Sequence, residues 1–159
     1  MIERTLVLVK PDGVQRGLIG DIISRFEQRG LKIVGMKMVW IDEKFSKKHY
    51  AAHVGKNMYP LLEKFITSAP VVAMAVEGIH AVELVRKVVG STEPKTAPIG
   101  TIRGDYAHVS YDYADEKQIS VKNLVHASGN KEEADQEVGL WFSETELYEY
   151  ESSHDRHVL

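Results

Sequence analysis

The chain has 159 residues, of which 43% are hydrophobic and 27% are charged, and its formal net charge is −3. These values are ordinary for a globular protein with a real core, and the acidic balance predicts neither a nucleic-acid nor a membrane partner. The absence of cysteine excludes disulfides, zinc–thiolate sites and thiol catalysis. We expect one domain over residues 1–159 in the cytoplasm, since no signal-peptide pattern and no apolar run of transmembrane length occur.

The first part of the chain alternates strand and helix patterns. Residues 5–9 are apolar on both faces, which predicts a central strand. After a glycine-rich turn, apolar residues recur at helical spacing over residues 19–26, and Gly30 is a typical helix stop. Residues 31–40 predict a second strand, and residues 42–53 predict a helix capped by an aspartate.

The pattern then continues with less regular spacing. A short helix is predicted over residues 61–67, and a third strand, buried on both sides, over residues 71–76. An apolar stripe over residues 79–89 predicts another helix. Residues 106–122 are rich in tyrosine and charge, and we expect a surface hairpin or an extended loop there.

The last elements are a fourth strand at residues 123–126 and a helix over about residues 131–138, opened by the capping box of Asn130 and Glu133. Residues 143–146 offer a further capping box, and the polar tail is expected at the periphery or across a neighbouring subunit.

This order of elements predicts an α+β fold of the ferredoxin-like split βαβ type, with a four-stranded antiparallel sheet and helices on one face. The alternative, a doubly wound sheet, would show more strands in strict alternation with helices.

The segment NLVHAS places a lone histidine, His126, between the end of an apolar strand and the N-terminus of a helix. Backbone N–H groups and the positive end of a helix dipole favour phosphate there and disfavour a protonated imidazole. A neutral histidine beside phosphate can attack phosphorus, so we interpret His126 as a nucleophile. The alternative is a hydrogen-bonded structural histidine, which the local pattern alone favours because it is commoner.

Four further side chains are candidates for the same chemistry. Lys10 follows a central strand, where its ammonium group can meet phosphate, although a solvated strand end fits equally well. Arg103 lies in an expected loop, where a fixed guanidinium can bind phosphate oxygens in bidentate fashion. Glu137 can fold back to fix the imidazole tautomer. Arg86 stands off the apolar stripe of its helix, a position that usually means exposure.

Other motifs are absent or incomplete. The phosphate-loop pattern GxxxxGK[ST] and the dinucleotide pattern GxGxxG do not occur. His49 and His53 share a helical face, but the segment lacks the glutamate of a metalloprotease, so we interpret them as surface or pocket histidines and expect no zinc site. Tyrosines in residues 106–122 could stack bases, but the segment has as many acids as bases, which argues against a nucleic-acid groove.

Five segments together closely resemble the nucleoside diphosphate kinase family: LVLVKPDGVQRGLIG, PVVAMAVEG, TIRGD, NLVHAS and GLWF. In that family the motif histidine takes the γ-phosphate of a nucleoside triphosphate, mainly ATP, and passes it to a nucleoside diphosphate. The resemblance therefore implies a ping-pong reaction through a phosphohistidine on His126. It also implies Mg²⁺, bound mainly through nucleotide phosphates, and a homo-oligomer, a hexamer or alternatively a tetramer.

The resemblance also assigns roles by motif match. It makes His126 the nucleophile, Glu137 the residue that orients it, and Ser128 a neighbour of the phosphate, with Lys10 as a further catalytic residue. The nucleotide-binding residues that it implies are Lys10, Tyr50, Met58, Leu62, Arg86, Thr92, Arg103 and Asn123.

The chain departs from the family pattern at three places. Gly129 replaces an acidic residue that lies near the magnesium waters in the family. Met58 stands where the family has an aromatic ring against the base, and Tyr59 is the alternative if the register shifts. Residues 106–122 are expected to be a surface insertion.

Two rival hypotheses belong to other classes. A ferredoxin-like regulatory or RNA-binding module would need exposed aromatic side chains on its sheet. An inactive relative would act only through interactions, but retention of the histidine, the lysine, the glutamate and both arginines argues against it.

Overall fold

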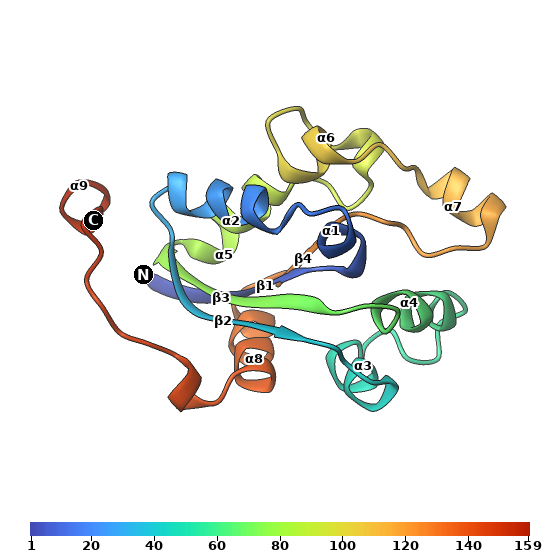
Figure 1. The fold of residues 1–159 in the computed structure, drawn as a ribbon, viewed down its shortest axis with the longest axis horizontal. Coiled ribbons are helices and arrows are strands. Elements are labelled where there is room, and N and C mark those ends of the chain that lie inside the picture. The colour runs from blue at the N-terminus through green and yellow to red at the C-terminus, as the bar shows by residue number, and fades with distance from the viewer.

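The computed structural model describes residues 1–159, and its centre is a four-stranded antiparallel sheet in the order β2-β3-β1-β4 (Figure 1). β1 pairs with β3 along its whole length and carries β4 on its other side. The predicted α+β, ferredoxin-like fold is confirmed. The strands are β1 (Ile2–Val9), β2 (Lys32–Val39), β3 (Val71–Ile79) and β4 (Val125–Ala127).

Helices cover both faces of the sheet (Figure 1). One face packs against α2 (Ile19–Gln28) and α5 (Ala81–Val89), and the other against α3 (Glu43–His49), α4 (Tyr59–Ile66) and α8 (Lys131–Trp141). Since successive strand side chains point to opposite faces, β1 supplies Val7 to the first core and Leu8 to the second. The expectation of helices on one face was wrong, because central strands that are apolar on both sides need cover on both sides.

Helix ends follow local capping, with boundaries that differ from the predicted ones. The Asp42 carboxylate accepts the Phe45 N–H, which starts α3, but this helix ends at His49 rather than at residue 53. β3 continues to Ile79, and α5 begins only at Ala81. Ile79 is therefore the end of a strand and not part of the helical stripe.

Residues 106–122 contain a short helix, α7 (Tyr111–Lys117), so neither a hairpin nor an extended loop describes them. The Ser110 hydroxyl accepts the Tyr113 N–H and starts this helix. The segment is fastened to the preceding loop, since the Tyr111 N–H donates to Glu93 Oε1 at 2.9 Å. Only Ala114 of α7 is buried, as expected for a surface segment.

The chain after α8 packs on its own β2. Tyr148 N–H donates to Val34 O at 2.8 Å, and Val158 of the last helix, α9 (Asp155–Val158), lies against Gly30. Earlier in this C-terminal segment, Ser143 and Glu146 form the predicted capping box. The remaining short elements are α1 (Pro11–Gln15), α6 (Ile102–Tyr106) and two single turns at Pro94–Thr96 and Glu144–Glu146. None of the helices is long and apolar enough to cross a membrane.

Candidate active site

His126 is presented by a tight turn that precedes β4. The Val125 N–H donates to Asn123 O at 2.8 Å around Leu124, whose φ is 71°, so residues 123–125 form a γ-turn. The Leu124 N–H donates to Asp12 Oδ2 at 3.0 Å, and the Lys10 N–H donates to Leu124 O at 2.8 Å. The strand therefore starts at Val125 and not at residue 123, because a positive φ at a leucine breaks extended pairing.

The imidazole of His126 is held by one nitrogen and open at the other. Its Nε2 lies 3.0 and 3.1 Å from the two oxygens of Glu137, and its Nδ1 has no hydrogen-bond partner. The Ser128 hydroxyl also donates to Glu137, at 2.6 Å, and accepts the Leu6 N–H. Burial alone would raise the pKa of Glu137, but the hydrogen bonds from His126 and Ser128 lower it. An ionised Glu137 fixes the tautomer with hydrogen on Nε2, which leaves a lone pair on Nδ1.

A small polar cavity of about 140 Å³ adjoins His126, and its lining brings together most residues that the sequence singled out. Lys10 Nζ donates to Asn123 Oδ1 at 2.9 Å, and Asn123 Nδ2 donates to Thr92 O at 2.9 Å. Burial and the charge of Arg103 lower the pKa of Lys10 to about 8. With Arg86 this makes three basic side chains around one cavity, which suits an anion. The lining comprises Lys10, Arg86, Val89, Gly90, Thr92, Arg103, Asn123, His126 and Ala127.

Arg103 does more than line this cavity. It lies on α6, which the Thr101 side chain caps, and not in a loop as expected. Its guanidinium donates to three backbone carbonyls, Gly90 O at 3.0 Å, Asn123 O at 3.1 Å and Val125 O at 2.7 Å. Two of its five N–H groups therefore remain for an anion. Burial and the charge of Arg86 lower the pKa of Arg103 to about 10.

The residues expected to contact a base have different environments. Tyr50 is buried, its hydroxyl has no hydrogen-bond partner, and its ring centre lies 6.3 Å from that of His126. Leu62 is buried, whereas Met58 is 54% exposed. The alternative Tyr59 is buried, and its hydroxyl contacts Ser46 and donates to Glu63. Tyr59 is thus not free to stack on a base.

His49 lies beside the nucleophile candidate, which the interpretation as a surface or pocket histidine missed. Its side chain is 0% exposed, and its Nδ1 accepts the Trp141 Nε1–H at 3.1 Å. His49, His126 and Glu137 offer ligand atoms within 4.8 Å of one another, as in a metal site. However, Nδ1 of His49 and both Glu137 oxygens already take part in hydrogen bonds. For the contact between His49 and Trp141, the only signal in the sequence was the GLWF segment of the family resemblance, which carries Trp141.

Gly129 is explained by the start of α8. Asn130 Oδ1 accepts the Glu133 N–H at 2.9 Å, as the predicted capping box requires, but Glu133 Oε2 accepts the Gly129 N–H rather than that of Asn130. A Cβ at residue 129 would lie 2.6 Å from Glu133 Oε2. An acidic side chain at this position would have to displace the glutamate, so the glycine suits this cap.

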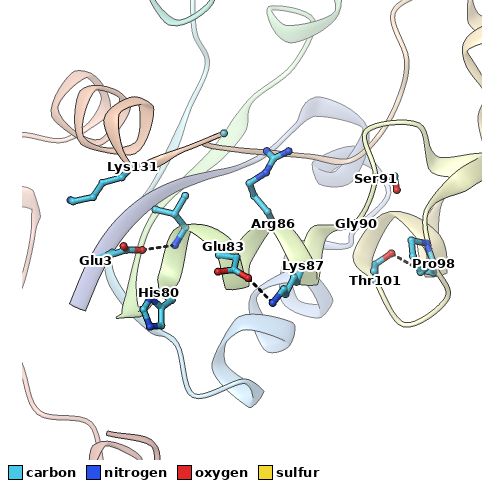
Figure 2. Close-up of a pocket in the computed structure, with 12 residues that line it drawn as sticks. Glu3, His80, Glu83, Arg86, Lys87, Gly90, Ser91, Pro98, Thr101 and Lys131 are labelled. Atoms are coloured by element: carbon cyan, nitrogen blue, oxygen red, sulfur yellow. Dashed lines mark hydrogen bonds and ion pairs between the residues drawn. The ribbon is translucent and has the colours of Figure 1, made fainter. Parts of the chain in front are cut away.

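A larger surface cavity of about 720 Å³ lies beyond Arg86 and is bordered by α5, β1 and the loop at Pro98 (Figure 2). Its other charged groups are paired locally. Lys87 Nζ lies 2.7 Å from Glu83 Oε1 (Figure 2), and the Val82 N–H donates to the Glu3 carboxylate. The smaller cavity is the better candidate, since it contains His126 and its cations converge.

The imidazole of His126, with one nitrogen held by a carboxylate, borders a basic cavity, an arrangement that suits phosphoryl transfer. The nucleoside diphosphate kinase family model matches residues 3–147. The nucleoside diphosphate kinase of Pyrococcus furiosus is 56% identical over 149 residues, which cover 94% of this chain and 88% of that protein. The relative from Borreliella burgdorferi is 46% identical over 155 residues, which cover 94% and 93%.

Solved structures agree. A transition-state mimic of the nucleoside-diphosphate kinase from Borrelia burgdorferi, with bound vanadate and ADP, has a TM-score of 0.94 and 45% identity, over 97% of this chain and 95% of that one. The halophilic enzyme from Halobacterium salinarum in complex with CDP has a TM-score of 0.88 and 42% identity, over 100% and 99%. The chain therefore belongs to the nucleoside diphosphate kinase family, and its activity is phosphoryl transfer between nucleotides. The rival regulatory or RNA-binding module would need exposed aromatic side chains on its sheet, but helices cover both sheet faces.

Proposed function

We propose that His126 takes the γ-phosphate of a nucleoside triphosphate, mainly ATP, and passes it to a nucleoside diphosphate. The observation that carries the proposal is the split environment of the imidazole. His126 Nε2 is within hydrogen-bond distance of the Glu137 carboxylate, whereas His126 Nδ1 has no hydrogen-bond partner. The same side chain borders the cavity that Lys10, Arg86 and Arg103 line. Because one site serves donor and acceptor in turn, the kinetics are ping-pong.

The surrounding residues supply charge and position, which is what phosphoryl transfer requires of a protein. Lys10, Arg86 and Arg103 neutralise the phosphate oxygens. Asn123 and Thr92, joined by a hydrogen bond, border the same cavity and bind the sugar and phosphate part of the nucleotide. Ser128 donates to the same Glu137 oxygen that lies 3.0 Å from His126 Nε2, and so helps to hold the carboxylate in place.

Mg²⁺ is the cofactor that we propose. The polar side chains around the cavity are cationic or neutral, and Glu137 is occupied by His126 and Ser128. This donor set fits Mg²⁺ held by nucleotide phosphate oxygens rather than by protein carboxylates. When bound there, Mg²⁺ neutralises phosphate charge.

The base is held by apolar contacts. We assign this contact to Met58, which is 54% exposed, together with Leu62 and Tyr50, which are buried. A site that packs on a base without hydrogen bonds discriminates weakly between bases. We therefore propose a broad range of nucleotides.

The assembly is a homo-oligomer, hexameric in our proposal with a tetramer as the alternative. β2 is an edge strand, and it presents Met36 and Met38 at 56% and 57% exposure, followed by Trp40 at 66%. An exposed apolar row on an edge strand is suited to cover by a second copy. The mass from light scattering decides between the two sizes. We also propose that the protein is cytoplasmic. Its chain forms one domain, in which residues 106–122 are a surface insertion.

The experiment is phosphorylation by ATP labelled in its γ-phosphate. Wild type should retain acid-labile label, and His126→Ala should retain none although it stays folded, because only the nucleophile is lost. His108→Ala is the matched control, since His108 lies outside the cavity. Labelling of His126→Ala at the wild-type level would refute the assignment.

A further inference from the structure

Helix α8 presents two hydrogen-bonding side chains one turn apart. Glu137 and Trp141 are four residues apart, so they lie on the same face of the helix. Glu137 contacts His126 Nε2, and the Trp141 indole donates to His49 Nδ1. One helix thus holds two imidazoles that come from β4 and α3.

The two imidazoles pack directly on each other. Their ring centres lie 4.6 Å apart with an angle of 82° between the planes, and the His49 side chain is fully buried. An indole N–H can only donate, so His49 Nδ1 carries no proton and the hydrogen is on Nε2. Burial, and next the charge of His126, lower the pKa of His49 to about 3. His49 is therefore a neutral imidazole.

The contact with Glu137 alone does not fix the tilt of the His126 ring. The two Glu137 oxygens lie at almost equal distances from Nε2, 3.0 and 3.1 Å, which fixes the position of that nitrogen but not the tilt of the ring. The tilt decides where Nδ1 points. The ring of His49, packed edge to face against that of His126, fixes the plane.

We propose that His49, anchored by Trp141, is a positioning residue that sets the plane of the His126 ring for attack on phosphorus. This inference rests on the proposed role of His126. Packing alone does not account for a histidine here, because its Nε2 is buried without a partner, and an apolar side chain would fill the volume without that unpaired donor. A neutral neighbour is also required, since a second cation would oppose the positive charge that develops on His126.

The first test is His49→Asn, which offers an oxygen to the Trp141 N–H but removes the ring. We expect single-turnover phosphorylation of His126 to slow by ~10-fold or more, as a small misplacement of a reacting atom does. ADP affinity should change less than ~2-fold, because the cavity lining is kept. The control is His53→Asn, since the His53 side chain makes no hydrogen bond and does not line the cavity. An unchanged phosphorylation rate in His49→Asn would overturn the inference.

The second test is Trp141→Phe, which keeps an aromatic ring and removes the N–H. With Nδ1 free, His49 becomes easier to protonate, so the acid limb of phosphorylation should move to higher pH. The groups that face His49 are Glu137 from α8, His126 from β4, Lys10 at the end of β1, and Tyr50 and His53 after α3. All of these stay in the variant. A role in packing alone would leave the acid limb unmoved, which counts against the inference.

The outcomes separate the two proposals. If wild type itself forms no phosphohistidine at His126, the proposed function fails and this inference with it. If wild type is phosphorylated and both His49→Asn and Trp141→Phe match its rate and pH profile, only the positioning role fails.

Discussion

Replacement of Glu137 by glutamine removes the charge opposite His126 while keeping the size of the side chain. The carboxylate accepts the Ser128 hydroxyl at 2.6 Å and lies 3.0 Å from His126 Nε2. A hydrogen bond to a charged group contributes about 1.5–3 kcal/mol against roughly 0.5–1.5 for a neutral one. The difference of ~1–2 kcal/mol corresponds to a roughly 5- to 30-fold loss in kcat, because the charge on His126 develops only in the transition state.

The assay measures phosphorylation of His126 by rapid quench and ADP affinity by titration. Phosphorylation should slow by that factor, and affinity should change little, because Glu137 is not part of the cavity lining. Asp135→Asn is the matched control, since Asp135 is an exposed acid of α8 that pairs with Lys131. Equal kcat in Glu137→Gln and wild type would show that the carboxylate does not orient the imidazole.

Arg103→Lys should lower both kcat/KM and the melting temperature, because a point charge cannot reach the three carbonyls that the guanidinium holds; wild-type values of both would disprove the role. ADP affinity should fall as pH rises above about 8, where Lys10 loses its proton in the free protein, and Lys10→Met should lack this inflection. Between that pH and the ordinary pKa of lysine, the free energy of unfolding of wild type should rise with pH, since the unfolded chain binds more protons than the folded one. Gly139→Ala, at an exposed position of α8, should stabilise the fold by ~0.5–1 kcal/mol. Gly104→Ala should destabilise it strongly, because its Cβ would meet the backbone oxygen of Pro98. Thermal melts check both.

Much of the fold follows from patterns that act locally. The strands at residues 5–9 and 71–76 are apolar on both sides, and burial of both sides is what places them at the centre of the sheet. The caps at Asp42 and Asn130 start helices where expected, since their side chains bond to backbone only three residues away. Such short-range effects can be deduced from the sequence.

The failures have two physical origins, the lack of a buried face and contacts between distant residues. The helix α7 has one buried residue, so no apolar stripe announced it. The γ-turn at Leu124 needs a positive φ that leucine disfavours, and contacts from Asp12 and Lys10 impose it. The contact of His49 with Trp141 spans 92 residues. Features fixed by contacts this distant leave no local pattern in the sequence.

The γ-turn before His126 also has a consequence for the folding chain. Its backbone is held by Asp12, which is 112 residues away, and by Arg103, which is 20 residues from Asn123. Contacts that close long loops form late, because the entropy of closure must be overcome first. The site that we propose for phosphate transfer is therefore complete only once β1, α6 and β4 have met. A nascent or partly unfolded chain carries the same histidine without the surroundings that hold it.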